Sequence, residues 1–272
     1  MSLFAFTNLY STTNHTLHPY CPITLKNTLE MYFERLSIEG SSPHISKDCY
    51  DDRKGTYTLQ LKDNLTMEEV ANLNRPIVLA TYSARYAEII KNGIDKFKAE
   101  MRFKSEYVKK TNDVLNKIKK KLKMQNENVT FVGMHYRGTD YNRHLKKEYK
   151  WYKPPPDHKY YLNAMFYFMK HYRNVIFLLM SIDKQWLETN VPYLQKIAHL
   201  VVNPTNSKPA EDLALLSYCN HSIISYGTFG SVAALYNEGT TFVYNLGLSL
   251  DQRGATVAMG IAQILPNWHI RD

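Results

Sequence analysis

The chain has 272 residues, enough for one or two domains, and 44 % of them are hydrophobic, which is ordinary for a protein with an apolar core. No run reaches the ~18–20 apolar residues of a membrane helix and the N-terminus lacks a signal-peptide pattern, so no anchor or export signal is visible. The formal net charge of +9 suits an anionic ligand such as nucleic acid, an anionic membrane or a nucleotide phosphate, and it selects none of them.

The three cysteines, Cys21, Cys49 and Cys219, show no Cys-x-x-Cys or Cys/His spacing, so we expect no structural zinc. Cys21 and Cys49 could pair in an oxidising compartment, whereas Cys219 lies in a segment predicted to be buried and is interpreted as a packed side chain. Four Asn-x-Ser/Thr triplets, which are glycosylation acceptors only in the secretory pathway, begin at Asn14, Asn64, Asn128 and Asn220.

The first part of the chain, residues 1–125, gives the weaker patterns. Residues 65–73 predict a helix that opens with the threonine and glutamate of a capping box. Residues 76–80, which begin with a proline, predict a strand. From about residue 83 to residue 124 the periodicity of apolar residues is helical.

This helical pattern ends in a lysine-rich stretch. Val108, Leu115, Ile118 and Leu122 fall on one face, and seven lysines occupy the rest: Lys109, Lys110, Lys117, Lys119, Lys120, Lys121 and Lys123. The stretch is interpreted either as the solvated face of an amphipathic helix packed on a sheet or as a nucleic-acid-binding surface. The first interpretation is favoured, because the stretch lacks the interleaved aromatic residues on which single-stranded binders stack bases.

After residue 125, apolar strands alternate with helical patterns. Strands are predicted at 129–134, 174–180, 197–202, 222–226 and 240–245. Helices are predicted between them at 157–172, with Asp157 as the N-cap, around 186–193, at 210–219 and at 232–238. This alternation predicts an α/β fold with a doubly wound parallel sheet. Right-handed crossovers then bring the polar strand ends to one edge, which is where such sheets bind ligands.

Gly227-Thr228-Phe229-Gly230-Ser231 joins the fourth predicted strand to the N-terminus of a helix. The glycines let the backbone approach a ligand closely, and the free N–H groups and helix dipole favour a phosphate, to which the two hydroxyl groups could add donors. The alternative is a tight turn whose hydroxyl groups only cap the helix. The segment is neither a Walker loop nor a GxGxxG motif.

Three further side chains lie at this predicted edge. Arg137 follows the first strand and suits a diphosphate, which a guanidinium holds by two parallel hydrogen bonds; its alternative role is an ion pair with Asp140. His135 is a donor to a base or phosphate, or a histidine bonded below the site. Asp212 opens a helix and is interpreted as a reader of a purine edge or as a partner of the helix dipole.

These residues predict a domain that binds a nucleoside diphosphate, with Arg137 aimed at the charge. An arginine at that place best serves a reaction in which the diphosphate leaves, because it stabilises the negative charge that grows on the leaving group. The residues therefore point to glycosyl transfer from a nucleotide sugar.

Two motifs carry a family resemblance. HYRGTDY (135–141) resembles the HxRRGDY motif of the α-1,2-fucosyltransferases, and the looser HxRxxD is shared with α-1,6- and protein O-fucosyltransferases. EDLALLSYCNHSIISYGTFGSVAALY (211–236) is similar to the family's second motif, in which an Asp-containing helix leads through CNH to a GTFG-type loop. LPNWHI (265–270) resembles the family's C-terminal end. The similarity covers roughly residues 100–272.

The resemblance implies a GT-B-like enzyme that uses GDP-L-fucose without a metal and inverts the anomeric carbon. Arg137 would hold the β-phosphate, His135 would lie near the guanine nucleotide and Asp212 would read the guanine, while a cradle for the diphosphate would be formed by Gly227, Thr228, Gly230 and Ser231. Fucose would go to the 2-hydroxyl of a β-galactoside or similar glycan. Family enzymes usually work in the Golgi lumen behind an N-terminal anchor.

Two departures qualify the resemblance. Gly138 stands where the family has a second arginine, and Arg143 is a candidate to supply that charge. The family also opens with a strand and a glycine-rich GNQ-type loop, and this chain is expected to begin after them, with 2–20 as the helix that follows. The alternative function is therefore a truncated or non-catalytic relative that binds a GDP-sugar or glycan. Asp140 and Asp183 are equal candidates for the general base.

The domain prediction follows from these patterns. Residues 1–125 are expected to form a smaller acceptor-side α/β region with a helical connector, and this region is incomplete if the chain begins after the family's first strand. Residues 126–272 are expected to form the Rossmann-like domain that binds the GDP-sugar.

Overall fold

The structure is a computed structural model, and it describes residues 20–37, 39–41, 57–59, 77–79, 93–95, 97–138, 140–149, 153–203, 207–248 and 257–272. The chain divides into two compact units, Met1–Lys104 and Ser105–Asp272. This division falls before the lysine-rich helix, whereas the sequence analysis places a domain boundary at residue 125. The helix belongs to the second unit because its apolar face packs there.

The first unit contains two short pairs of parallel strands. Strand β1 (Tyr20–Pro22) leads into helix α2 (Ile23–Leu29) and pairs with β2 (Glu39–Ser41). Strand β3 (Tyr57–Leu59) pairs with β4 (Ile77–Leu79), so the strand predicted at 76–80 is confirmed. The helix predicted at 65–73, the helix predicted within 2–20 and Cys49 lie outside the described residues.

Aromatic packing joins the two ends of this unit. Phe33 forms an antiparallel bridge with Phe103, and their ring centroids are 4.9 Å apart. Both side chains are buried, together with Leu36, Phe97 and Met101. The helical pattern predicted from 83 to 124 is therefore interrupted near Phe103, where the chain forms a bridge with Phe33 within the first unit instead of continuing as a helix.

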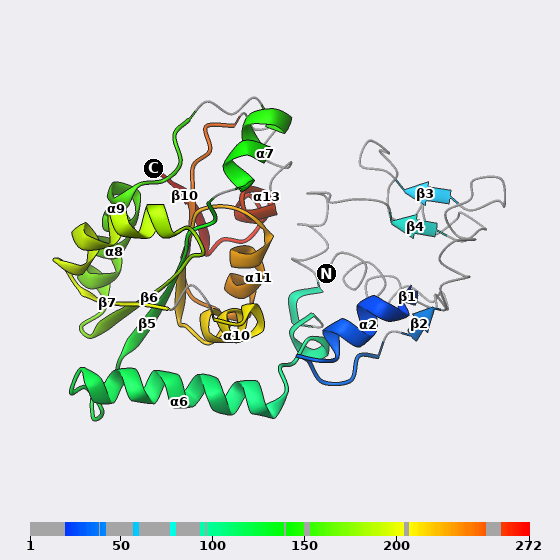
Figure 1. Cartoon of the computed structure of the whole chain (residues 1–272), viewed down its shortest axis with the longest axis horizontal. Helices are drawn as coiled ribbons and strands as arrows, with labels where there is room; N and C mark the ends of the chain where they lie inside the picture. Colours follow the sequence, from blue (N-terminus) through cyan, green and yellow to red (C-terminus); the bar gives the residue numbers. More distant parts are fainter. Residues whose placement is uncertain are drawn as a thin grey trace. The chain divides into compact units, whose positions relative to one another are not determined.

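The second unit is built on one sheet of six parallel strands (Figure 1). In chain order the strands are β5 (Thr130–His135), β6 (Val175–Met180), β7 (His199–Val202), β8 (His221–Ile224), β9 (Thr241–Tyr244) and β10 (Trp268–Arg271). They lie in the order β10-β9-β8-β5-β6-β7. The chain thus winds outward from β5 in one direction and then from β8 in the other, which is the doubly wound order of dinucleotide-binding sheets.

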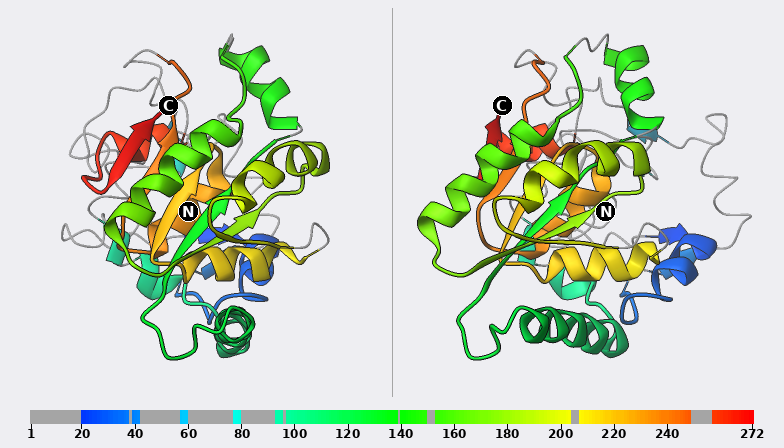
Figure 2. Two further views of the ribbon diagram at one scale, coloured as in Figure 1. Left: turned by 90° about the vertical axis from the view of Figure 1, so that its left-hand side faces the viewer. Right: turned by 60° about the vertical axis from the view of Figure 1, so that its left-hand side comes forward.

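Helices cover both faces of this sheet (Figures 1 and 2). The helices of this unit are α6 (Ser105–Lys121), α7 (Asp140–Tyr149), α8 (His158–His171), α9 (Lys184–Gln195), α10 (Pro209–Ser217), α11 (Thr228–Tyr236) and α13 (Val257–Ala262). Helices α8 and α9 lie on one face, and α10 and α11 lie on the other. Asp157 caps α8 as predicted, since its carboxylate accepts a hydrogen bond of 2.9 Å from the backbone N–H of Lys159.

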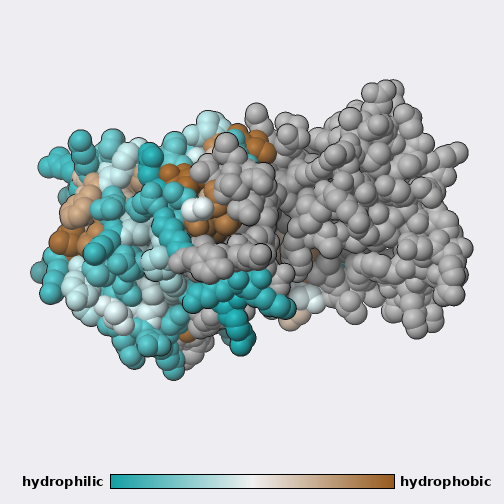
Figure 3. Space-filling view, turned by 90° about the horizontal axis from the view of Figure 1, so that it is seen from above, coloured by the Kyte–Doolittle hydropathy of each residue, from teal (hydrophilic) through white to brown (hydrophobic). Residues whose placement is uncertain are grey.

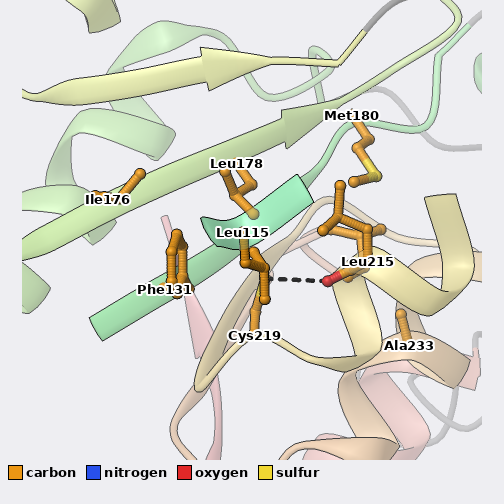
Figure 4. Close-up of a cluster of buried hydrophobic side chains, with 9 residues drawn as sticks. Leu115, Phe131, Ile176, Leu178, Met180, Leu215, Cys219 and Ala233 are labelled. Carbon is orange, nitrogen blue, oxygen red and sulfur yellow. Dashed lines mark hydrogen bonds between the residues drawn. The ribbon is translucent and has the colours of Figure 1, made fainter. Parts of the chain in front are cut away.

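The core under α6, α10 and α11 is a cluster of buried hydrophobic side chains (Figure 4). Leu115 of α6 packs with Phe131 of β5 and Leu215 of α10, so the apolar face of the lysine-rich helix is confirmed as a packing face. Cys219 is also in this core; its thiol donates to the carbonyl of Leu215 at 3.4 Å, and burial raises its pKa to about 12. The interpretation of Cys219 as a packed side chain is therefore confirmed.

The α/β class and the doubly wound parallel sheet are confirmed, with two corrections. The sequence analysis predicts five strands and misses β10, whose four residues, WHIR, are too few to show a period. Helix α11 begins at Thr228 and not at residue 232, because Gly227 makes the turn on its own.

The face of the second unit that Figure 3 shows is mostly hydrophilic, with separate hydrophobic patches. Scattered apolar side chains of this kind are normal for a globular protein. Within the part of the chain that the structure describes, no helix combines the length and apolar character that a membrane crossing requires.

Candidate functional site

The candidate site lies where the winding of the sheet reverses, between β5 and β8. These two strands are neighbours, and His135 at the end of β5 pairs with Ile224 at the end of β8. One crossover leaves β5 over one face and the other leaves β8 over the opposite face, and sheets of this kind bind their ligands beyond the carboxyl ends of such a strand pair. The site residues predicted from the sequence follow these same two strands, and the structure brings the two groups together.

Arg137 and Gly227 are in contact across this reversal point. A Cβ placed on Gly227 would lie 3.4 Å from Cγ of Arg137, so the arginine stem packs directly against the glycine. The loops are also joined by a hydrogen bond of 2.9 Å from the backbone N–H of Arg137 to Oγ of Ser225. The guanidinium lies 5.9 Å from the centre of the Tyr141 ring, which limits where it can reach.

Gly227 gives α11 an N-terminus suited to an anion. Its φ of 87° is in the left-handed region that favours glycine, and it provides no side-chain cap for the helix. The first backbone N–H groups of α11 are therefore not capped by the residue that precedes them. Thr228 is the first residue of the helix and is exposed, so its hydroxyl stands beside these donors.

Ser231 lies differently from the other residues of this segment. Its side chain is fully buried, and its hydroxyl donates to the carbonyl of Gly227 at 2.8 Å. The bond closes the first turn of α11 internally. The structure therefore supports a role for Ser231 in fixing the conformation of Gly227 and gives no support to direct contact with a phosphate.

His135 lies beneath the first turn of α11. A Cβ on Gly230 would lie 2.9 Å from Nδ1 of His135, so the missing side chain at Gly230 makes room for the imidazole. The ring is 5.2 Å from that of Phe229, and Nδ1 has no hydrogen-bond partner among the described residues. Burial, and secondarily the charge of Arg137, lower its pKa to about 4, so the imidazole is neutral near pH 7.

Asp212 belongs to a second part of the same sheet edge. It lies in the first turn of α10, and its carboxylate accepts hydrogen bonds from Nδ2 of Asn203 and, at 2.7 Å, from the hydroxyl of Ser207. Partial burial raises its pKa despite these bonds. The carboxylate borders a cavity of about 230 Å³ lined by Tyr107, Lys110, Thr111, Val114, Asn203, Ser207, Glu211, Asp212 and Leu215.

This cavity is lined by both apolar and polar side chains. Tyr107, Val114 and Leu215 supply flat or aliphatic surface, and Lys110 pairs with Glu211 at 2.6 Å. A heterocycle with hydrogen-bond donors would fit such a site, with its apolar faces against the walls and its donors towards Asp212.

The remaining predicted residues are the two candidates for the general base, Asp140 and Asp183, and the two positions considered for a second positive charge, Gly138 and Arg143. Asp140 is the first residue of α7, and its side chain lies outside the described residues. Asp183 caps α9 through a bond of 3.0 Å from the backbone N–H of Trp186. A Cβ on Gly138 would clash with Oδ2 of Asp183, so a carboxylate occupies the space that a side chain at 138 would need. Arg143 is exposed on α7.

Sequence reasoning misses the residues that hold this edge together. Ser225 follows β8 and is completely buried, and Asn203 and Ser207 orient Asp212. The only signal in the sequence for Ser225 and Asn203 is their position directly after an apolar strand. Among the described residues, no group of three or more histidine, cysteine, aspartate or glutamate side chains is arranged to hold a metal ion.

A doubly wound α/β domain with an arginine, an uncapped helix N-terminus and a carboxylate-bordered cavity on one edge defines a class of nucleotide-binding-type proteins. Comparison with known families identifies the family to which the chain belongs. The model of glycosyl transferase family 11 matches residues 95–271, and the chain belongs to this family.

Curated relatives agree with this assignment. The chain is 32 % identical over 139 residues to galactoside 2-alpha-L-fucosyltransferase Sec1 of Mus musculus. It is 33 % identical over 140 residues to galactoside alpha-(1,2)-fucosyltransferase 1 of Oryctolagus cuniculus. Each match covers 51 % of this chain and 37 % of the relative. The resemblance to the α-1,2-fucosyltransferases is therefore confirmed, and the matched part of this chain spans less than half the length of these relatives.

Among solved structures, the chain is similar to the NodZ alpha-1,6-fucosyltransferase soaked with GDP-fucose, with 12 % identity and a TM-score of 0.43. The same enzyme co-crystallised with GDP shows 14 % identity and the same TM-score. Each comparison covers 86 % of this chain and 87 % of the other.

Proposed function

We propose that this protein is a fucosyltransferase that moves L-fucose from GDP-fucose to the 2-hydroxyl of a galactoside glycan, with inversion and without a metal. Membership of glycosyl transferase family 11 and the names of the curated relatives support the reaction class. The single structural observation that carries the proposal is the contact between Arg137 and Gly227, which places an arginine stem against the N-terminus of α11.

The chemistry follows from this juxtaposition. The acceptor oxygen forms a bond to the anomeric carbon while the bond from that carbon to the β-phosphate oxygen breaks, so GDP leaves with an added negative charge. Arg137 and the N–H groups of α11 stabilise that charge, which is the task a cation performs in metal-dependent transferases. The proton of the acceptor hydroxyl goes to a base, for which Asp140 and Asp183 both remain candidates.

The cavity beside Asp212 is proposed to hold the guanine. Guanine carries an N–H and an amino group on one edge, and an ionised carboxylate accepts from both. Asn203 and Ser207 hold the carboxylate in place, and each of its oxygens has a further lone pair for the base. His135 lies beneath the first turn of α11. We therefore propose that it supports this turn, and not that it contacts the nucleotide as the family resemblance implies.

A second candidate function is a GDP-sugar-binding relative without activity. Gly138 supports it, because the second arginine of the family motif is absent and Asp183 occupies the adjacent space. A missing positive charge weakens stabilisation of the leaving diphosphate more than it weakens ground-state binding if that arginine acts in the transition state. A Golgi location and a membrane anchor are proposed by family analogy alone.

The test is calorimetric titration with GDP. It is followed in the same sample by measurement of GDP released from GDP-fucose with a β-galactoside acceptor, with and without EDTA. We expect binding and turnover. Binding without turnover would favour the second candidate, and loss of turnover in EDTA alone would contradict the metal-free mechanism. Absence of GDP binding would overturn both.

The variant Asp212→Asn tests the base site in the same assay. We expect GDP affinity to fall while affinity for ADP stays the same, because adenine lacks the paired donors. In the wild-type protein, GDP affinity should fall with decreasing pH as Asp212 is protonated, beginning above the usual range of an aspartate because burial raises its pKa. An Asp212→Asn variant that still prefers GDP to ADP would show that the base lies elsewhere.

A further inference from the structure

Two adjacent tyrosines on α8 reach the ends of the two strands that flank the reversal point. The hydroxyl of Tyr161 donates to the carbonyl of His135, the last residue of β5, at 3.0 Å. The hydroxyl of Tyr160 donates to the carbonyl of Ile224, the last residue of β8, at 2.8 Å. Helix α8 crosses the face of the sheet opposite α10 and α11 (Figure 2). The pair therefore holds both strand ends from the face that does not carry the phosphate-binding helix.

The carbonyl of His135 belongs to a short network that ends at Arg137, and the carbonyl of Ile224 lies in the peptide unit whose N–H, that of Ser225, enters this network. The carbonyl of His135 also accepts from the backbone N–H of Ser225 at 3.1 Å, and Oγ of Ser225 accepts from the backbone N–H of Arg137 at 2.9 Å. A shift of either strand end would therefore move Arg137 relative to Gly227. Nothing else in this network comes from α8, and none of its tyrosines belongs to the motifs that carry the family resemblance.

Packing keeps both rings in place. Tyr160 is 3 % exposed and Tyr161 is fully buried, and their rings meet edge to face with centroids 5.0 Å apart. Tyr161 also meets Trp186 edge to face at 5.2 Å. Burial raises the pKa of both phenols well above 10.0, so both hydroxyl groups keep the proton that they donate at any physiological pH.

We propose that Tyr160 and Tyr161 are positioning residues, whose hydroxyl groups fix the ends of β8 and β5 so that Arg137 and the N-terminus of α11 address the same phosphate. The inference rests on the proposed function for its ligand, GDP, and on the described hydrogen bonds for its geometry. Groups that hold a binding residue in place commonly matter almost as much as the residue itself, because a displacement of about 1 Å can cost about 100-fold in rate.

The experiment compares Tyr160→Phe and Tyr161→Phe, singly and together, with Tyr244→Phe. Tyr244 is the matched control: it is 5 % exposed, it touches Tyr160 edge to face, and its hydroxyl donates to a carbonyl, that of Pro154, at 2.8 Å. All three substitutions remove one hydroxyl-to-carbonyl bond from one aromatic cluster. Only the first two bonds reach the strand ends beside the site.

The first readout is the dissociation constant of GDP, measured by calorimetry at a temperature at which circular dichroism shows each variant folded. We expect Tyr160→Phe and Tyr161→Phe to raise it by about tenfold and the double variant by more, with Tyr244→Phe within about twofold of wild type. Equal affinity in all variants, or equal weakening by Tyr244→Phe, would overturn the inference, and the proposed function would stand because the wild-type protein binds GDP.

The second readout is backbone hydrogen exchange in peptides that contain Arg137 and Gly227, without any ligand. We expect faster exchange in both peptides for the Tyr160 and Tyr161 variants and no change for Tyr244→Phe. This measurement also decides the case in which wild type fails to bind GDP. The proposed function then falls, and unchanged exchange in these peptides would overturn the positioning role as well.

Discussion

The two edges of the six-stranded sheet both carry a cavity and an arginine, but they present opposite backbone groups. At the carboxyl edge, α10 and α11 begin, and the cavity beside Asp212 has a volume of about 230 Å³. At the amino edge, α8 and α9 end, and a larger cavity of about 470 Å³ is lined by residues that include Arg173, Lys196 and His199.

The difference shows that volume and positive charge do not by themselves make an anion site. Helices present N–H groups where they begin and carbonyl groups where they end. Arg173 and Lys196 therefore stand beside the negative ends of two helices. Their positive charges compensate those partial negative charges, so their position is explained without a ligand. Arg137 stands beside a positive helix end, so an anion placed between them would be attracted to both.

The largest expected effect is the loss of turnover caused by replacing Arg137, and it tests the difference between the two edges directly. Arg137→Ala should lower kcat by about 100–1000-fold, equivalent to about 3–4 kcal/mol of transition-state stabilisation, because it removes a donor to the leaving diphosphate. The control is Arg173→Ala, which removes an exposed arginine from the amino edge and should change turnover by less than about twofold. Unchanged turnover in folded Arg137→Ala would end the assignment of this edge.

The second expected effect is on stability in acid. The pKa of His135 is lowered to about 4, from 6.5 in the unfolded chain, so below pH 6.5 the unfolded state binds the proton more tightly. The free energy of unfolding is therefore unaffected by His135 titration above pH 6.5. It falls by about 3 kcal/mol as the pH falls from 6.5 towards 4, because the unfolded state takes up the proton first. Denaturant unfolding of wild type and His135→Gln across this window measures the difference.

The control for that measurement is His199→Gln, which removes an exposed imidazole at the amino edge. Burial also lowers the pKa of His221, so part of the acid sensitivity will remain in His135→Gln. If wild type and His135→Gln lose stability in parallel from pH 6.5 to pH 4, His135 is not the neutral buried residue that supports α11.

Much of this edge can be predicted from the sequence because strand ends in a parallel sheet meet. His135, Arg137 and Gly227 each follow or end an apolar strand, and winding alone places them together. The reversal between β5 and β8 is not visible in any local pattern, since strand order depends on which crossover takes which face. The sequence analysis therefore selects the correct pair of strands without knowing that they are adjacent.

The parts that sequence reasoning misses depend on contacts between distant segments. Tyr160 and Tyr161 lie within an amphipathic helical pattern, and nothing local distinguishes them from other core tyrosines among the 21 in the chain. Ser231 has the residue type expected of a phosphate ligand, but the helix begins at Thr228, and this places its hydroxyl one turn inside. A shift of four residues in a predicted helix start thus changes the role of a side chain.

The smallest expected effect compares two glycines whose substitution crowds different neighbours. Gly230→Ala brings a Cβ within 2.9 Å of Nδ1 of His135, and Gly133→Ala, within β5, brings one within 3.0 Å of Leu216 on α10. Overpacking should destabilise each variant by about 1–3 kcal/mol. Only Gly230→Ala displaces the first turn of α11, so only it should weaken GDP binding, by about tenfold.

The pair separates the geometry of the edge from the stability of the core. Calorimetry with GDP and denaturant unfolding on the same preparations give both quantities for each variant. If Gly133→Ala weakens GDP binding as much as Gly230→Ala does at equal loss of stability, the geometry of the carboxyl edge depends on the packing of the whole core. If only Gly230→Ala weakens it, the first turn of α11 is set locally, by the imidazole beneath it, and the carboxyl edge differs from the amino edge in support as well as in the backbone groups it presents.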